Sequence, residues 1–373
     1  LSIFILWISR NLFGESLLAI RIFVYTISSA TVFVSGITAK EIGGNKFAQT
    51  LAAVAVIFAG VVLGGGSYFS MNAFDVFLST VMFYYLVKLL KTDNKKLWIP
   101  IGLMFGIGLM NKLTFLFLGF GLIIGLILTR NRKYFFTKEL WIAGALAIII
   151  FLPHIIWQFA NDFPTIEFMR NAAERKNVSQ NVIQFFIGSI MELNPSSILL
   201  LVSAFYFLFF NKDGKKFALI AVLYLTVFFV FVFNNGKPYY MGVLYPVILA
   251  AGAVGIERII VTYLKPWARY VLFILLLPGY LFAVPFAIPV LDVEDFIKYS
   301  EATGIKPSVG ERNQVGILPQ FYADRFGWKE MVEDVAAAYN QLSSEEKKKA
   351  LVFGQNYGEA SAVNYYRGLY NLP

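Results

Sequence analysis

The chain lacks cysteine altogether and has a single histidine, His154, among its 373 residues. Without cysteine there is no disulfide framework and no thiolate metal site, and the redox compartment cannot be inferred from thiols. One histidine also excludes a metal site built from several histidines. Charge is scarce as well, because 15% of the residues are charged, whereas a typical soluble domain has about 25%.

Hydrophobic residues are correspondingly abundant. They make up 58% of the chain, against roughly 45–50% in soluble proteins, and they occur in blocks of bilayer length. Apolar runs between charged or turn-forming breaks predict about ten transmembrane helices. These runs lie at 17–39, 47–65, 68–90, 97–111, 113–129, 140–158, 184–210, 217–234, 239–260 and 270–289. We therefore expect an all-α polytopic membrane protein.

Positive charge is unevenly distributed along the predicted bundle. The formal net charge is +9, and most Lys and Arg residues fall in alternate loops, on one side of the predicted helices. Because short cytoplasmic loops carry an excess of these residues, that side is expected to face the cytoplasm. The chain start and the residues after about Val290 then lie outside. Membrane topology thus accounts for the basic excess, which argues against nucleic-acid binding.

The residues after the last predicted helix have the composition of a soluble protein. Apolar residues recur at helical spacing between 331 and 339, and "ALVFGQ" at 350–355 is typical of a short buried strand. We therefore divide the chain into a transmembrane domain at 1–290 and an extracytoplasmic α/β domain at 291–373. The second domain is expected to close over a site in the membrane.

Two further outer segments are longer than turns. "LSIFILWISRNLF" at 1–13 predicts a short helix at the membrane interface. The polar segment at 161–181 is long enough for a loop that covers a site. The chain begins at Leu1 without an initiator Met, so we expect a fragment that is truncated at both ends.

Polar side chains within or beside the apolar runs are the functional candidates. A charged residue in a membrane-spanning helix costs at least about 2.5–3.5 kcal/mol on insertion scales, so it needs a partner or a ligand. The candidates lie near the outer ends of the predicted helices, and several come from "FNNGKPYYMGVLYP", where Gly and Pro break a helix. They are Arg21, Asp75, Lys112, His154, Lys237, Tyr239 and Tyr240.

Together these residues are expected to form a clamp for an anionic group. Arg21, Lys112 and Lys237 would converge with tyrosine hydroxyls on one phosphate. Asp75 would then bind a metal ion, a sugar hydroxyl or the clamp itself, so a divalent cation stays open as a cofactor. A cationic pocket between lipid and outer water suits a substrate with a phosphate head and a hydrocarbon tail.

Each candidate also has a structural explanation. Asp75 would pair with a basic residue of a neighbouring helix, and the long side chain of Arg21 would extend to the membrane surface. His154, as a lone histidine, would be a packing residue. Tyrosines at this depth would belong to an aromatic belt, although Lys237 does not fit that explanation.

Several segments that carry these residues resemble one family. The sequence is similar to bacterial members of the dolichyl-phosphate-mannose protein mannosyltransferase superfamily, GT-C membrane glycosyltransferases related to the lipid A aminoarabinose transferase. The similar segments are "WISRNLFGESLLAIRIF", "AKEIGGNKFAQTLAA", "MNAFD", "GIGLMNKLTFLFLGFGLIIGL", "KPYYMGVLYPVILAAGAVGIE", "LPQFYADRFGW" and "GQNYGEA".

The resemblance implies transfer of a hexosyl or pentosyl group from a polyprenyl-phosphate carrier, with inversion, on the outer face of the cytoplasmic membrane. The acceptor would be a lipid, a polysaccharide or a protein. On this basis Arg21, Lys112, Lys237 and Tyr240 contact the carrier phosphate. His154 and Tyr239, candidates by their position in the sequence alone, complete the substrate-binding set. Asp75 matches the second acidic position of the family and is the catalytic candidate.

The sequence departs from the family at its start. Family members have a further transmembrane helix and an outer loop with an acidic residue, the usual candidate for the general base, upstream of the segment that resembles residues 1–13. We therefore expect the main base outside this chain and the fragment to be inactive. A transporter or flippase of anionic polyprenyl lipids is the alternative, since it needs the same phosphate clamp.

Overall fold

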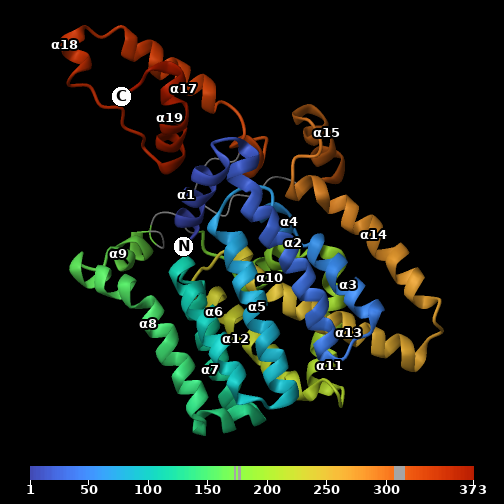
Figure 1. The fold of residues 1–373 in the computed structure, drawn as a ribbon. Helices are drawn as coiled ribbons and strands as arrows, with labels where there is room; N and C mark the ends of the chain where they lie inside the picture. Colours follow the sequence, from blue (N-terminus) through green and yellow to red (C-terminus); the bar gives the residue numbers. More distant parts are fainter. Residues whose placement is uncertain (172–173, 175–177, 306–315) are drawn as a thin grey trace. The chain divides into compact units, whose positions relative to one another are not determined.

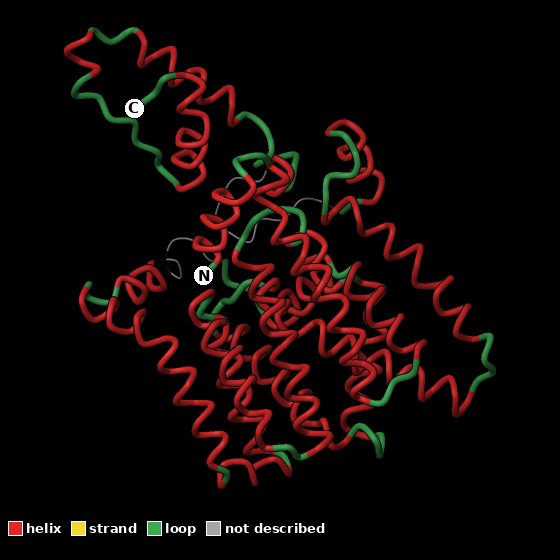
Figure 2. The backbone as a smooth tube through the Cα atoms, viewed as in Figure 1, coloured by secondary structure: helices red, strands yellow, loops and turns green. Residues whose placement is uncertain are grey.

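The structure is a computed structural model of the chain and describes residues 1–171, 174, 178–305 and 316–373 (Figure 1). The described residues separate into two compact units. The first unit is Leu1–Leu291, and the second consists of the described residues between Asp292 and Pro373. The described backbone consists of helices and loops and contains no strand (Figure 2).

The first unit is a helical bundle in which long helices run side by side (Figure 1). Its longest helices are α2 (Leu17–Ile42), α5 (Met71–Thr92), α8 (Lys138–Ala160), α13 (Tyr245–Tyr263) and α14 (Ala268–Ala287). The shorter α-helices are α1 (Ser2–Phe13), α3 (Lys46–Ile57), α4 (Gly60–Gly65), α6 (Trp98–Asn111), α7 (Thr114–Leu128), α9 (Pro164–Asn171), α10 (Val182–Leu193), α11 (Ile198–Phe210) and α12 (Ala218–Phe233). The 3₁₀ segments between them are η1 (Lys95–Leu97), η2 (Arg130–Phe136), η4 (Pro195–Ser197), η5 (Lys215–Phe217) and η6 (Pro238–Leu244).

The number of complete membrane spans differs from the prediction. By length and composition, the described residues contain 6 helices able to cross a membrane, or 8 if each of two bent pairs counts as one span. The prediction of ten spans is therefore not confirmed, although helices occupy all ten predicted ranges. The shortfall has a geometric cause, since α6 has 14 residues and a span needs about 20.

Two breaks in the helices account for further differences from the predicted spans. Asn194 lies at one break and forms a hydrogen bond to the other. The predicted span 184–210 is instead α10 followed by 195–210 at a bend of 100°, with Asn194 at a positive φ (84°) before Pro195. The Asn194 amide donates a 3.1 Å hydrogen bond to the carbonyl of Phe58. Phe58 lies between α3 and α4, where the predicted span 47–65 is interrupted. The Phe58 carbonyl, freed at one break, is thus paired by a side chain at the other.

The core of the first unit lies around α13. Most of its residues from Tyr245 to Glu257 are fully buried, because the run "AAGAVG" brings neighbouring backbones close. A Cβ added at Gly252 would overlap the carbonyl oxygen of Leu200 in α11. The close approach of α11 and α13 therefore requires glycine at this position.

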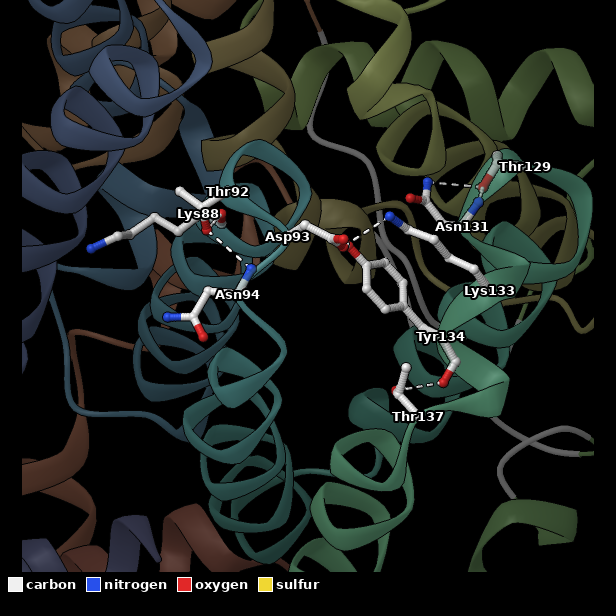
Figure 3. A network of polar contacts seen from close by, with 9 residues as sticks. All are labelled: Lys88, Thr92, Asp93, Asn94, Thr129, Asn131, Lys133, Tyr134 and Thr137. Carbon is white, nitrogen blue, oxygen red and sulfur yellow. Dashed lines mark hydrogen bonds and ion pairs between the residues drawn. The ribbon is translucent and has the colours of Figure 1, made fainter.

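Loops that carry most of the basic residues meet at one end of the bundle. There Asp93, which follows α5, accepts a 2.8 Å hydrogen bond from the Tyr134 hydroxyl and pairs with Lys133 at 2.9 Å (Figure 3). The hydrogen bonds from Lys133 and Tyr134 lower the pKa of Asp93. Glu41 of α2 pairs with Lys91 of α5 at 2.9 Å. These contacts join successive turns on the side predicted to be cytoplasmic.

The second unit contains α15 (Val293–Thr303), α16 (Gln320–Ala323), α17 (Trp328–Asn340), α18 (Ser344–Lys347) and α19 (Tyr357–Tyr370). Apolar side chains of α17 and α19 form its small core, which confirms the helix predicted over 331–339. The prediction of a strand at 350–355 is wrong: these residues form a loop. Leu351 and Phe353 are 91% and 88% exposed, and the described residues offer no neighbouring strand with which this segment could pair.

The outer segments also differ in part from expectation. Residues 2–13 form the predicted helix α1. Within the segment 161–181, by contrast, α9 occupies Pro164–Asn171, so part of the expected loop is helical. Residues 172–173 and 175–177 of that segment lie outside the described residues.

Candidate functional site

Lys112 lies at the centre of the candidate site. It occupies the two-residue turn between α6 and α7, where its backbone is extended (φ −156°, ψ 140°). Its Nζ donates a 2.8 Å hydrogen bond to Asn72 Oδ1 in the first turn of α5. The same Nζ lies 5.1 Å from the ring centre of Tyr239 and 4.6 Å from that of Tyr240. An amide oxygen and two aromatic faces therefore surround this ammonium group.

The two tyrosines reach Lys112 because the chain breaks its helix just before them. α12 ends at Phe233, and η6 begins at Pro238, directly after Lys237. The predicted break at this segment is therefore confirmed. The rings of Tyr239 and Tyr240 meet edge to face at 4.6 Å, a favourable arrangement for an aromatic pair. This packing directs both rings to the Lys112 turn.

The charges around Lys112 act on it in opposite directions. Lys112 lies in a turn, outside the helices on either side, and burial lowers its pKa. The carboxylate of Asp75 raises the pKa, and the positive charge of Lys237 lowers it. Two lysines from distant parts of the sequence are thus close enough to repel each other. A phosphate placed between them would relieve that repulsion.

Asp75 lies one turn further along α5 and is 2% exposed. Its Oδ2 accepts a 2.6 Å hydrogen bond from the hydroxyl of Thr114, the first residue of α7. Its buried Oδ1 has no hydrogen-bond partner in the described part of the chain. An unsatisfied buried carboxylate oxygen is uncommon, so Oδ1 is an acceptor available to a ligand hydroxyl or amine.

The structure brings together Asp75, Lys112, Lys237, Tyr239 and Tyr240, but not the other two predicted site residues. Arg21, on α2, has no hydrogen bond or ion pair to this cluster within the described ranges. His154, on α8, has its Nε2 3.2 Å from Gln158 Nε2 and stacks on Phe151 at a ring distance of 4.9 Å. Its contacts are those of a packing histidine.

Four polar residues of interest were not among the predicted site residues. Thr114 binds Asp75, and Asn72 binds Lys112. Glu257, 3% exposed, accepts hydrogen bonds from the backbone N–H groups of Asn45 (2.9 Å) and Ala48 (3.4 Å) at the start of α3. Glu192 lies in α10. Both glutamates fall inside predicted membrane spans. Because charged residues in such spans are functional candidates, the sequence alone was enough to single them out.

Metal ligands do not gather at the site. In the parts of the chain that the structure describes, no three His, Asp or Glu side chains lie close enough to hold a metal ion together. The cluster around Lys112 instead combines two cations, one carboxylate and polar neutral groups. Such a donor set suits an anion beside a hydroxyl-bearing or amine-bearing group.

The chain is similar to one protein family and to one enzyme of known structure. Residues 1–157 match the family model described as dolichyl-phosphate-mannose-protein mannosyltransferase. The apo structure of ArnT from Cupriavidus metallidurans is 14% identical to this chain, with a TM-score of 0.63, and the alignment covers 99% of this chain and 64% of that one. The structure of the same enzyme bound to undecaprenyl phosphate gives 15% identity, a TM-score of 0.62 and the same coverage.

These matches confirm the resemblance found in the sequence and the all-α GT-C fold that it implies. The chain spans 64% of the length of the ArnT structures. A search among curated proteins finds no significant match. The helices and the family match together describe a multi-pass membrane protein.

Proposed function

We propose that the protein is a membrane glycosyltransferase that uses a polyprenyl-phosphate sugar as donor. Its acceptor is a lipid, a polysaccharide or a protein on the outer face of the cytoplasmic membrane. The observation that carries the proposal is the Lys112 ammonium group, held by Asn72 and faced by Tyr239 and Tyr240, with Lys237 close by. This is a preorganised site for a phosphate monoester or diester.

In the proposed reaction, an acceptor hydroxyl or amine attacks the anomeric carbon from the face opposite the phosphate. The bond between that carbon and the phosphate oxygen breaks, and the polyprenyl phosphate leaves with both bonding electrons. A single displacement of this kind inverts the anomeric configuration. Lys112 and Lys237 stabilise the negative charge that grows on the leaving phosphate, and the tyrosine hydroxyls donate to its oxygens.

The proton of the acceptor passes to a carboxylate acting as general base. Asp75 is the acid that the cluster holds, and its Oδ1 is the oxygen left for this role or for orienting a sugar hydroxyl. The resemblance to the family also implies an acidic residue of a preceding outer loop as the main base. In both cases Thr114 fixes the carboxylate of Asp75 through Oδ2.

The further parts of the proposal concern the membrane. The basic turns face the cytoplasm, the Lys112 end of the bundle faces outward, and residues 291–373 form an extracytoplasmic domain. ArnT, the protein of similar fold, has been seen with undecaprenyl phosphate. A long polyprenyl phosphate is accordingly the probe with which to test this chain.

The first test measures binding of undecaprenyl phosphate to the purified protein in detergent. Lys112→Ala and Lys237→Ala each remove a charge-assisted hydrogen bond, so the affinity should fall about tenfold or more. Lys96→Ala, an exposed lysine at the opposite end of the bundle, should leave it unchanged. Wild-type affinity in both site variants would refute the phosphate clamp.

A second test separates transfer from transport. Membranes that contain the protein receive labelled polyprenyl-phosphate sugars, with and without acceptor preparations. Release of polyprenyl phosphate that depends on acceptor supports the transferase. Movement of intact labelled lipid between leaflets, without consumption of donor, would support the flippase instead.

A further inference from the structure

The turn between α13 and α14 combines exposed aromatic rings with unpaired positive charge. Tyr263, Trp267 and Tyr270 are 72%, 60% and 73% exposed, and Lys265 and Arg269 alternate with them along the chain. Trp and Tyr favour the boundary between lipid tails and water, because their rings are apolar and their N–H or O–H groups are polar. The turn therefore has the composition of a membrane-surface segment.

Arg269 is held in place without being neutralised. Its guanidinium lies 5.5 Å from the ring centre of Phe47 in α3, and Phe47 meets Phe273 of α14 edge to face at 5.7 Å. Among the described residues, Arg269 has no ion pair with an acid and its buried Nε has no hydrogen-bond partner. Arg269 also lies in the first turn of α14. The helix dipole is positive at this end, so it disfavours a cation there.

The nearby acidic residues are already engaged. Glu257 accepts hydrogen bonds from the backbone at the start of α3. Asp213 pairs with Arg258 at 3.5 Å, and Arg258 also donates a 3.3 Å hydrogen bond to the carbonyl of Gly43. Within the described part of the chain, neither Lys265 nor Arg269 forms an ion pair with a carboxylate. The local excess of positive charge calls for an anion from outside the protein.

We propose that this turn binds the headgroup of an anionic phospholipid. Lys265 and Arg269 contact the lipid phosphate, Trp267 and Tyr270 lie at the level of its glycerol backbone, and the acyl chains run along the apolar surface of α14. Charge complementarity and the exposed aromatic rings together favour a membrane lipid over a soluble anion. The surface lies at the end of the bundle opposite Lys112, so it is independent of the proposed donor site.

The test uses native mass spectrometry of the purified protein in detergent, titrated with dioleoylphosphatidylglycerol and, as reference, dioleoylphosphatidylcholine. Each basic residue near a membrane surface contributes about fivefold to the affinity for anionic lipid. The double variant Lys265→Gln/Arg269→Gln should therefore bind phosphatidylglycerol roughly 25-fold more weakly, with unchanged binding of phosphatidylcholine. Lys96→Gln, which removes the same charge from another basic turn, should bind both lipids like the wild type.

Lys265→Gln alone also tests the proposal, because its exposed side chain makes no hydrogen bond or ion pair within the described ranges and its loss should not affect folding. It should weaken phosphatidylglycerol binding about fivefold. Equal losses in Lys96→Gln and Lys265→Gln would overturn the proposal in favour of a general charge effect. Wild-type binding by the double variant, or full competition by soluble glycerol phosphate, would overturn it as well.

Discussion

The ammonium group of Lys112 and the side-chain oxygen of Asn72 are joined by a hydrogen bond of 2.8 Å. This contact connects the turn between α6 and α7 to the first turn of α5, forty residues earlier in the sequence. Beside it, the Thr114 hydroxyl donates a hydrogen bond to Asp75. Two side-chain hydrogen bonds therefore connect the start of α5 to residues 112–114. The position of the cationic group therefore depends on how α5 packs against α6 and α7.

The first prediction concerns the support of Asp75. Thr114→Val keeps the shape of the side chain but removes the hydroxyl, which leaves a buried carboxylate without this partner. We expect a loss of about 1–3 kcal/mol in the free energy of unfolding. Thr114→Ser keeps the donor and should lose less. Thermal unfolding in detergent measures the difference, and equal destabilisation by both variants would show that the hydroxyl does not support Asp75.

The second prediction concerns pH and carrier binding. Lys112 must be protonated to attract phosphate, and burial lowers its pKa below that of an exposed lysine. Affinity for undecaprenyl phosphate should fall as pH rises through this lowered pKa, and so at a lower pH than about 10.4, the ordinary value for lysine. In Lys112→Arg the side chain stays positively charged at higher pH. The loss of affinity should therefore occur at a higher pH than in the wild type. Superimposable pH profiles of affinity would contradict this role of Lys112.

The third prediction concerns the network at the opposite end of the bundle. Hydrogen bonds from Lys133 and Tyr134 depress the pKa of Asp93, so the charged form is favoured in the folded state. The resulting stability is fully present above the unfolded pKa of about 3.9 and is lost as pH falls through the lower folded pKa. Asp93 is half exposed, so the contribution should stay below about 1 kcal/mol.

Asp93→Asn tests this network, because asparagine also tolerates the left-handed backbone at this position (φ 55°). The variant should be slightly less stable than the wild type at pH 7, and the difference should narrow below about pH 4. Unfolding midpoints over a pH series measure it. A difference that grows toward acid pH would have the wrong sign for a depressed pKa.

The fourth prediction compares two glycines within helices. Gly252→Ala places a methyl group against the carbonyl of Leu200 and should destabilise the protein by about 1–3 kcal/mol, since α11 and α13 must move apart. Gly144→Ala in α8 meets no atom within 4 Å and should be neutral or stabilising by about 0.5–1 kcal/mol. The unfolding midpoints of the two variants, measured in the same detergent, show the difference in stability. Similar effects at both positions would mean that the helix contact does not require glycine.

Much of the architecture could be predicted because hydropathy is a local property of the sequence. Every apolar run is helical, although two of them are broken into two helices each, and the Gly236 and Pro238 break appears where expected. The breaks at Phe58 and Asn194 were missed, and the hydrogen bond that connects them joins residues 136 positions apart. The strand expected at 350–355 failed for a similar reason: a strand needs a partner, which a local pattern does not reveal.

The sequence by itself determined which polar residues the apolar helices carry, because charge in a bilayer is costly wherever it occurs. Only the tertiary structure decided which of them meet. Packing brought Lys112, Lys237 and Asp75 into one cluster, placed His154 against its own helix and engaged Glu257 in pairing the backbone of α3. Side chains far apart in the sequence become neighbours only through helix contacts, and those contacts depend on shape complementarity that hydropathy does not encode.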